Sequence, residues 1–99
     1  MKILNEEEFN SAIEKDKVLV DFFATWCGPC RMLTPILEQV SEEVKNCKIF
    51  KVDVDESPNI ARRFGIMSVP TLILFEDGEE KDRVSGVRPK SQIIEFIGE

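Results

Sequence analysis

Two hydrophobic periodicities alternate along the chain, and they predict alternating strands and helices. In residues 18–24, β-branched and aromatic residues place apolar side chains on both faces of the run, which is typical of a central strand covered by helices on both sides. Residues 48–54 predict a second interior strand. Between these two runs, apolar residues step by four, three and four and form one buried helical stripe: Leu33, Leu37, Val40 and Val44. Strand, helix and strand in this order predict a right-handed parallel crossover.

Short polar motifs mark the ends of three further helices. Asn5 is followed three residues later by Glu8, a pairing that forms a capping box at a helix start. Ser57 precedes a proline, which favours a helix start at that point, and Gly65 is placed to end this short helix. Helices are therefore predicted over 6–15, from Ser57 to Gly65, and over 89–97.

A hairpin and a short first strand complete the predicted sheet. Asp77-Gly78 is a strong signal for a two-residue turn, so strands over 71–76 and 79–85 are expected to pair antiparallel. Ile3 and Leu4 are expected to add a short strand before the first helix. The resulting order, β-α-β-α-β-α-β-β-α, predicts an α/β fold in which a mixed sheet of about five strands is flanked by four α-helices.

Composition and charge narrow the class of protein. Ninety-nine residues, 42% of them hydrophobic, predict a single domain over 1–99 that folds without disulfide staples. The net charge of −6 and the lack of a basic stripe give little electrostatic support for binding a phosphate backbone, so no nucleic-acid partner is expected. No run approaches the ~20 apolar residues of a membrane span, and the first residues lack the apolar core of a signal peptide. We therefore expect a cytoplasmic protein with no membrane partner.

The candidate chemistry lies in two cysteines three residues apart, at the start of the predicted helix that carries Leu33, Leu37 and Val40. In a first helical turn, such positions share one face with Cα atoms about 5 to 6 Å apart, inside the disulfide range of about 4.4 to 6.8 Å. The unpaired N–H groups and positive dipole end of the helix lie beside Cys27 and favour its thiolate, which predicts Cys27 as the nucleophile and Cys30 as its partner. A structural zinc site would need two further ligands, and only Cys47 remains in a chain without histidine. No metal is expected.

The segment Trp26-Cys27-Gly28-Pro29-Cys30 resembles the active site of the thioredoxin family, and the resemblance extends over essentially the whole chain. It is carried at separated places: the Cys27 to Cys30 motif, Val20-Asp21-Phe22, Pro35, Val52-Asp53, Asp55, Val69-Pro70-Thr71, Gly78 and Gly86. The resemblance implies the thioredoxin fold and a monomeric general protein disulfide reductase that acts on disulfide-containing proteins. It also implies that the protein binds no cofactor and receives its electrons from a thioredoxin reductase, a flavoprotein that uses NADPH and FAD.

Family resemblance also assigns roles to residues around the cysteines. The carboxyl of Asp21 falls inside an apolar strand, where a raised pKa is expected, although the residues alone equally allow a solvent-facing position at a sheet edge. In thioredoxins the matching carboxyl lies buried behind the second cysteine, which implies that Asp21 is the acid/base group for Cys30 and that Lys51 modulates it. A cis peptide before Pro70 is implied against the usual trans preference. The expected docking surface comprises Trp26, Gly28, Pro29, Met67, Ser68, Val69, Pro70, Gly86 and Val87.

Two alternative functions and one unassigned thiol remain open. A thiol oxidant or isomerase would need a more strongly stabilised thiolate, and the uncharged Gly28-Pro29 pair favours reduction instead. A binding subunit whose docking surface matters and whose thiols do not is the second alternative. Cys47 belongs to no motif; it is either a small buried hydrophobic residue or a regulatory thiol.

Overall fold

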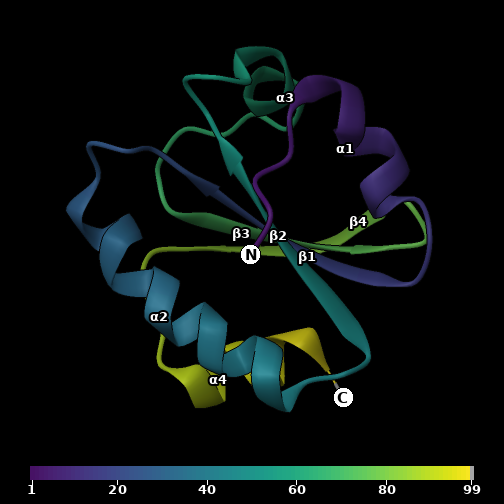
Figure 1. Cartoon of the computed structure of the whole chain (residues 1–99), viewed down its shortest axis with the longest axis vertical. Coiled ribbons are helices and arrows are strands. Elements are labelled where there is room, and N and C mark those ends of the chain that lie inside the picture. The colour runs from purple at the N-terminus through teal and green to yellow at the C-terminus, as the bar shows by residue number, and fades with distance from the viewer. Residues whose placement is uncertain (99) are drawn as a thin grey trace.

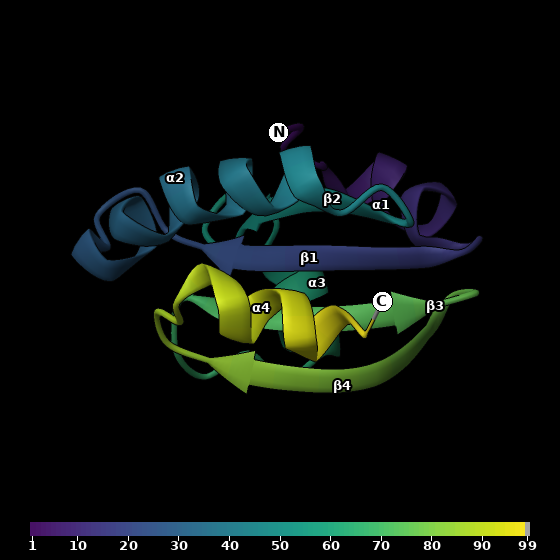
Figure 2. The ribbon, with the colours of Figure 1, turned by 90° about the horizontal axis from the view of Figure 1, so that it is seen from below.

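Helices cover both faces of a mixed four-stranded sheet whose strand order is β2-β1-β3-β4 (Figures 1 and 2). The structure is a computed structural model and describes residues 1–98. In chain order the elements are α1 (Glu6–Ile13), β1 (Lys17–Phe23), α2 (Gly28–Glu43), β2 (Cys47–Asp53), α3 (Pro58–Arg63), β3 (Thr71–Glu76), β4 (Glu79–Ser85) and α4 (Lys90–Ile97). Within these residues, the predicted α/β fold with a mixed sheet flanked by four helices is confirmed.

The sheet combines one parallel pair with two antiparallel pairs. Strand β1 pairs parallel with β2 and antiparallel with β3, and β3 pairs antiparallel with β4. Among the described residues the sheet has four strands rather than about five, because Ile3 forms only an isolated bridge with Lys51. The reason is local: Leu4 is buried in the core and Asn5 already caps α1. Too few residues lie before Leu4 to extend the pairing of Ile3 with Lys51 into a strand.

Alternation along β1 divides the core into two layers. Val18, Val20 and Phe22 pack among the residues of α1 and α3, whereas Leu19 packs on the other face of the sheet with the apolar stripe of α2 and with α4. Figure 1 shows α1 and α3 on one side of the sheet and α2 and α4 on the other. Because side chains alternate with a period of two, Asp21 belongs to the face that α2 covers.

Most local signals act as predicted. The capping box forms in both directions: the Glu8 N–H donates to Asn5 Oδ1 at 2.9 Å and the Asn5 N–H donates to Glu8 Oε1 at 3.0 Å. Asp77 and Gly78 have φ values of 51° and 88°, the positive angles that a type I′ hairpin turn requires. The helix α3 starts after Ser57 as predicted, but the Ser57 side chain does not form the capping hydrogen bond that a serine at this position favours, and its backbone lies outside the extended region.

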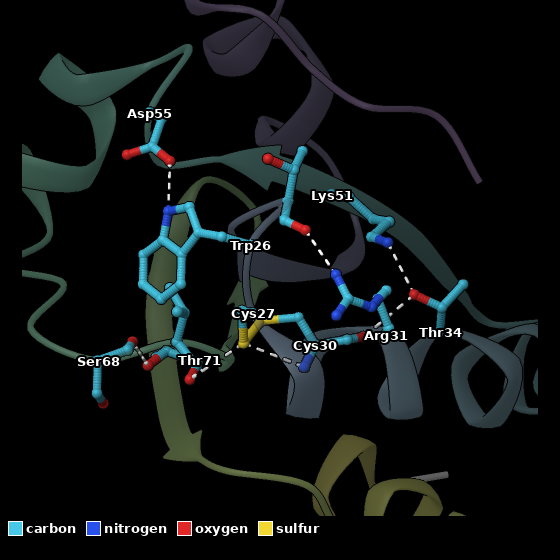
Figure 3. The surroundings of a disulfide bond; sticks show 11 residues. Trp26, Cys27, Cys30, Arg31, Thr34, Lys51, Asp55, Ser68 and Thr71 are labelled. Carbon is cyan, nitrogen blue, oxygen red and sulfur yellow. Dashed lines mark hydrogen bonds between the residues drawn. A yellow bond between two sulfur atoms is a disulfide. The ribbon is translucent and has the colours of Figure 1, made fainter.

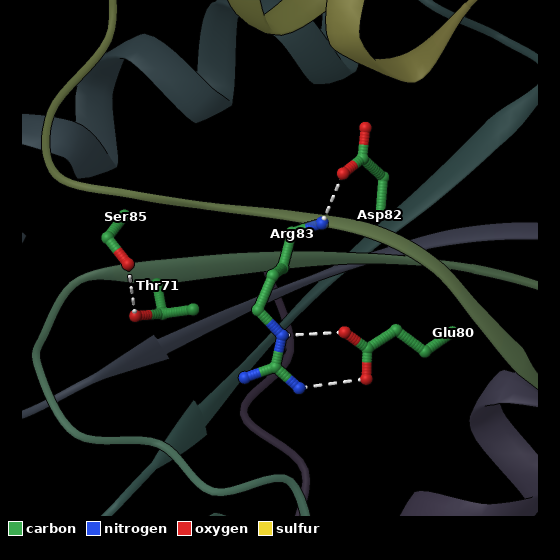
Figure 4. Close-up of polar contacts among 5 residues, drawn as sticks. All are labelled: Thr71, Glu80, Asp82, Arg83 and Ser85. Carbon is green, nitrogen blue, oxygen red and sulfur yellow. Dashed lines mark hydrogen bonds and ion pairs between the residues drawn. The ribbon is translucent and has the colours of Figure 1, made fainter.

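The edge strand β4 carries a charged outer surface. Arg83 forms two hydrogen bonds with the Glu80 carboxylate, at 2.6 and 2.8 Å (Figure 4). The same figure shows Thr71 of β3 hydrogen-bonded to Ser85 of β4, at 3.2 Å. Charged side chains on an edge strand disfavour pairing with another chain. The Thr71–Ser85 hydrogen bond joins the two strands at the end nearest the cysteines.

Candidate active site

The two cysteines form a disulfide across the first turn of α2 (Figure 3). Cys27 is the N-cap residue, and its Sγ accepts a hydrogen bond from the backbone N–H of Cys30 at 3.2 Å. The Cα atoms of the two residues lie 5.3 Å apart, which is within the range predicted from their spacing. When the disulfide is reduced, this same N–H and the helix dipole are positioned to stabilise negative charge on Cys27.

The surroundings of the two sulfurs differ. Both cysteines are buried, but Cys27 lies between the exposed Trp26 and the exposed Gly28-Pro29 pair, whereas Cys30 packs into the molecule. Cys27 Sγ also lies 3.7 Å from the carbonyl oxygen of Val69. A partner disulfide that approaches along the surface of Trp26 and Val69 therefore meets Cys27 before Cys30.

Asp21 lies fully buried beneath α2, and neither of its carboxyl oxygens has a hydrogen-bond partner. Desolvation by burial raises the pKa of Asp21 to about 7, and the charge of Lys51 opposes this rise. The alternative position at a solvent-facing edge is excluded, because β1 is an interior strand with neighbours on both sides. An acid with a pKa near neutrality can release and take up a proton at physiological pH.

Lys51 stands opposite Asp21 in the parallel register of β1 and β2. Its ammonium group donates a hydrogen bond to Thr34 Oγ1 at 2.9 Å, and it lies 4.3 Å from the centre of the Phe23 ring. The Thr34 hydroxyl in turn donates to the carbonyl oxygen of Cys30 at 3.3 Å. Sequence reasoning missed Thr34; its position four residues after Cys30 on the same helix face was the available signal.

An apolar depression adjoins the disulfide and brings together four of the predicted docking residues. Its volume is about 180 Å³. Trp26 is 68% exposed and donates its indole N–H to Asp55 at 2.9 Å, and Met67 is 96% exposed. The predicted cis peptide before Pro70 is confirmed. The lining residues are Trp26, Val54, Ile66, Met67, Ser68 and Val69, of which Val54 and Ile66 were not predicted.

The other predicted docking residues do not line this depression. The backbone N–H of Gly86 donates to the carbonyl oxygen of Pro70 at 2.9 Å, which links the end of β4 to the cis proline. Val87 is half-buried against the core layer under α2 and α4. Gly28 and Pro29 are exposed beside the disulfide. That these four residues and Pro70 belong to one docking surface therefore stays a prediction.

Cys47 lies at the far end of the sheet from the disulfide, at the first position of β2. It is buried, as expected of a small hydrophobic residue. Within residues 1–98, no group of three or more cysteines and carboxylates is arranged to hold a metal ion. In the same part of the chain, no helix is both long and apolar enough to cross a membrane.

A redox-active cysteine pair at the start of a helix, packed on a mixed sheet beside a cis proline, defines the thioredoxin-fold class of thiol–disulfide oxidoreductases. Comparison with known proteins agrees with this class. The thioredoxin family model matches residues 1–99. The chain is 50% identical over 99 residues to the thioredoxin of Chlamydia caviae, a match that covers 100% of this chain and 97% of that one. It is 45% identical over 95 residues to the thioredoxin of Staphylococcus epidermidis, covering 95% and 91%.

Solved structures give the same result. A mutant thioredoxin from Halobacterium salinarum NRC-1 superposes with a TM-score of 0.89 at 37% identity, over 97% of this chain and 86% of that one. Chloroplastic thioredoxin z superposes with a TM-score of 0.88 at 36% identity, over 99% and 91%. The chain belongs to the thioredoxin family, and it is a protein-disulfide oxidoreductase.

Proposed function

We propose that the protein is a general protein disulfide reductase in which Cys27 is the nucleophile. The Cys27 thiolate attacks one sulfur of a substrate disulfide, which forms a mixed disulfide and releases the first substrate thiolate. The Cys30 thiol then loses its proton and attacks Cys27 Sγ, which releases the second substrate thiolate. Two electrons pass to the substrate, which leaves as a dithiol, and the Cys27–Cys30 disulfide remains. The position of Cys27 at the N-cap of α2 is the observation that carries this proposal.

In this scheme, Asp21 is the group that accepts the Cys30 proton during the second step, and Lys51 modulates it. Its burial beneath α2 and its pKa of about 7 support this role, because the carboxylate form is then available as a base at neutral pH. A water molecule or a short side-chain movement would carry the proton between Cys30 and a carboxyl that forms no direct hydrogen bond.

Substrate docking is assigned to the surface around the apolar depression. An extended substrate segment would pair with the backbone of Val69, whose carbonyl oxygen already lies 3.7 Å from Cys27 Sγ. Exposed Trp26 and Met67 would contact apolar side chains that flank the substrate cysteine. The remaining members of this proposed surface are Gly28, Pro29, Ser68, Pro70, Gly86 and Val87.

The disulfide form is returned to the dithiol by a partner reductase, for which we propose a flavoprotein thioredoxin reductase that uses NADPH. Reduction is favoured as the direction of transfer because Gly28 and Pro29 place no charge between the cysteines. The protein would act as a monomer of one domain in the cytoplasm, where thiols are kept reduced.

Insulin reduction coupled to NADPH and a thioredoxin reductase tests this proposal. The wild-type protein should accelerate insulin reduction, and Cys27→Ser should abolish the acceleration. Cys30→Ser should instead form a stable mixed disulfide with insulin, because Cys27 can attack but nothing resolves the product. A rate that is unchanged by Cys27→Ser would remove Cys27 as the nucleophile. Cys47→Ser is the matched control and should reduce insulin at the wild-type rate.

A further inference from the structure

The ammonium group of Lys51 does not bond the carboxyl that faces it across the sheet. Lys51 and Asp21 are register partners in β2 and β1, and the charge of Lys51 acts on Asp21. The two carboxyl oxygens nevertheless have no hydrogen-bond partner. The Lys51 ammonium instead donates to the hydroxyl of Thr34 on α2, at 2.9 Å (Figure 3). The buried carboxyl of Asp21 thus has no hydrogen bond, while the ammonium group of its register partner Lys51 is bonded to Thr34.

The Thr34 hydroxyl accepts one hydrogen bond and donates another, and the chemistry of its partners fixes both directions. An ammonium group can only donate, so Thr34 Oγ1 must accept from Lys51 and direct its own proton to another acceptor. That acceptor is the carbonyl oxygen of Cys30, 3.3 Å away and one helical turn earlier. Thr34 therefore links the cation of β2 to the backbone of the second cysteine.

We propose that Thr34 is a positioning residue, whose hydroxyl holds the Lys51 ammonium against α2 and away from the carboxyl of Asp21. This inference rests on the proposed role of Asp21 as the proton acceptor for Cys30. If Lys51 paired directly with Asp21, the ion pair would stabilise the carboxylate and make it a weaker base. With Lys51 bonded to Thr34, the carboxyl stays unpaired and titrates close to neutral pH.

The elements packed around Asp21 show which charged and titratable groups, besides Lys51, could change its pKa. Strand β2 contributes Lys51, and α2 contributes the cysteine pair. The register partner on β3 is the apolar Leu72. The α4 residues buried on this face are the apolar Ile93 and Ile97. In the disulfide form the cysteines do not titrate, so Lys51 is the charge that Thr34 can move relative to Asp21.

The test is a carboxyl titration of the full-length oxidised protein by ¹³C NMR. In Thr34→Val, which keeps the shape and removes the hydroxyl, the titration midpoint of Asp21 should fall by about one pH unit or more as Lys51 turns to the carboxyl. Thr34→Ser restores a hydroxyl and should restore the wild-type midpoint. Thr34→Ala provides a second deletion if the valine variant folds poorly.

A Lys51→Gln background distinguishes the positioning role of Thr34 from a purely structural one. If Thr34 acts by holding Lys51, Thr34→Val should leave the Asp21 titration midpoint in this background where Lys51→Gln alone places it, because no cation remains to be moved. A purely structural role predicts instead that Thr34→Val shifts the midpoint by the same amount with and without Lys51. An unchanged midpoint in both Thr34→Val and Thr34→Ala would overturn the inference, as would a serine variant that behaves like valine. The titration involves no turnover, so its outcome is separate from that of the insulin assay, in which an unaffected Asp21→Asn would remove the proposed role of Asp21.

Discussion

Replacing Asp21 with asparagine should make the oxidised protein more stable at neutral pH, and increasingly so as the pH rises. Asp21 is fully buried without a hydrogen-bond partner. Burial raises its pKa from 3.8 to about 7, with Lys51 opposing the rise. The folded protein therefore holds this proton more tightly than the unfolded chain does. Between about pH 4 and pH 7 the unfolded chain binds fewer protons, so the free energy of unfolding falls as the pH increases through this window.

The expected magnitude follows from the difference between the two pKa values. The gap between 3.8 and about 7 corresponds to about 4 kcal/mol, at about 1.4 kcal/mol per pKa unit. This stability is fully present below about pH 4 and lost above about pH 7. The asparagine amide never ionises; its own unpaired donors cost about 1 to 3 kcal/mol at every pH. The difference in stability between Asp21→Asn and wild type should therefore grow by about 2 to 3 kcal/mol from about pH 5 to about pH 8.

Urea unfolding of the disulfide forms, followed by circular dichroism at a series of pH values, measures this difference. Asp82→Asn is a matched control because Asp82 is an exposed carboxylate on β4. Its stability profile should run parallel to that of the wild type. If the profile of Asp21→Asn also runs parallel to the wild type from about pH 5 to about pH 8, then Asp21 does not carry the buried proton and its proposed role in catalysis loses its basis.

Four further substitutions test the fold and the docking surface. Asn5→Ala removes the capping box and should lower the free energy of unfolding by about 1 kcal/mol, seen as a lower urea midpoint at unchanged slope. Gly78→Ala should cost about 1 kcal/mol because φ at this turn is 88°; a gain in stability would contradict the turn assignment. Leu37→Ala should cost about 2 to 5 kcal/mol, measured by urea unfolding, because Leu37 is completely buried. Trp26→Phe should change stability by less than about 1 kcal/mol yet slow the reduction of insulin more than that of a small disulfide, because the ring is 68% exposed.

The features that the sequence predicted well depend on neighbours along the chain. The capping box needs only Asn5 and Glu8, and the hairpin needs only two residues that tolerate positive φ. The disulfide spacing follows from one helical turn. Such features are decided by local geometry, and packing does not have to be known to predict them. The order of elements followed from these signals together with the hydrophobic periodicity.

The features that the sequence could not predict depend on contacts between distant segments. Ile3 gives a single bridge rather than a strand because Leu4 turns into the core, which only the packed structure reveals. Asp21 was ambiguous between an edge and an interior position until the sheet order placed β1 between β2 and β3. The hydrogen bond from Lys51 to Thr34 joins residues 17 positions apart, and no periodicity encodes a side-chain contact of that kind.

The proposed role of Asp21 as a proton acceptor would explain why a carboxyl occupies this position, because stability alone favours a different residue there. On the face that α2 covers, the alternation of β1 runs from Leu19 to Asp21 to Phe23, and its two neighbours are apolar and buried. An aliphatic side chain at this position would complete the core without an unpaired polar group. A buried carboxyl that lowers stability when ionised, on the face of the sheet that α2 covers, is a local conflict of the kind expected at functional sites. Stability and disulfide reduction should therefore change in opposite directions when Asp21 is replaced, whereas replacing Leu37 should lower stability and leave the reaction of the folded protein intact.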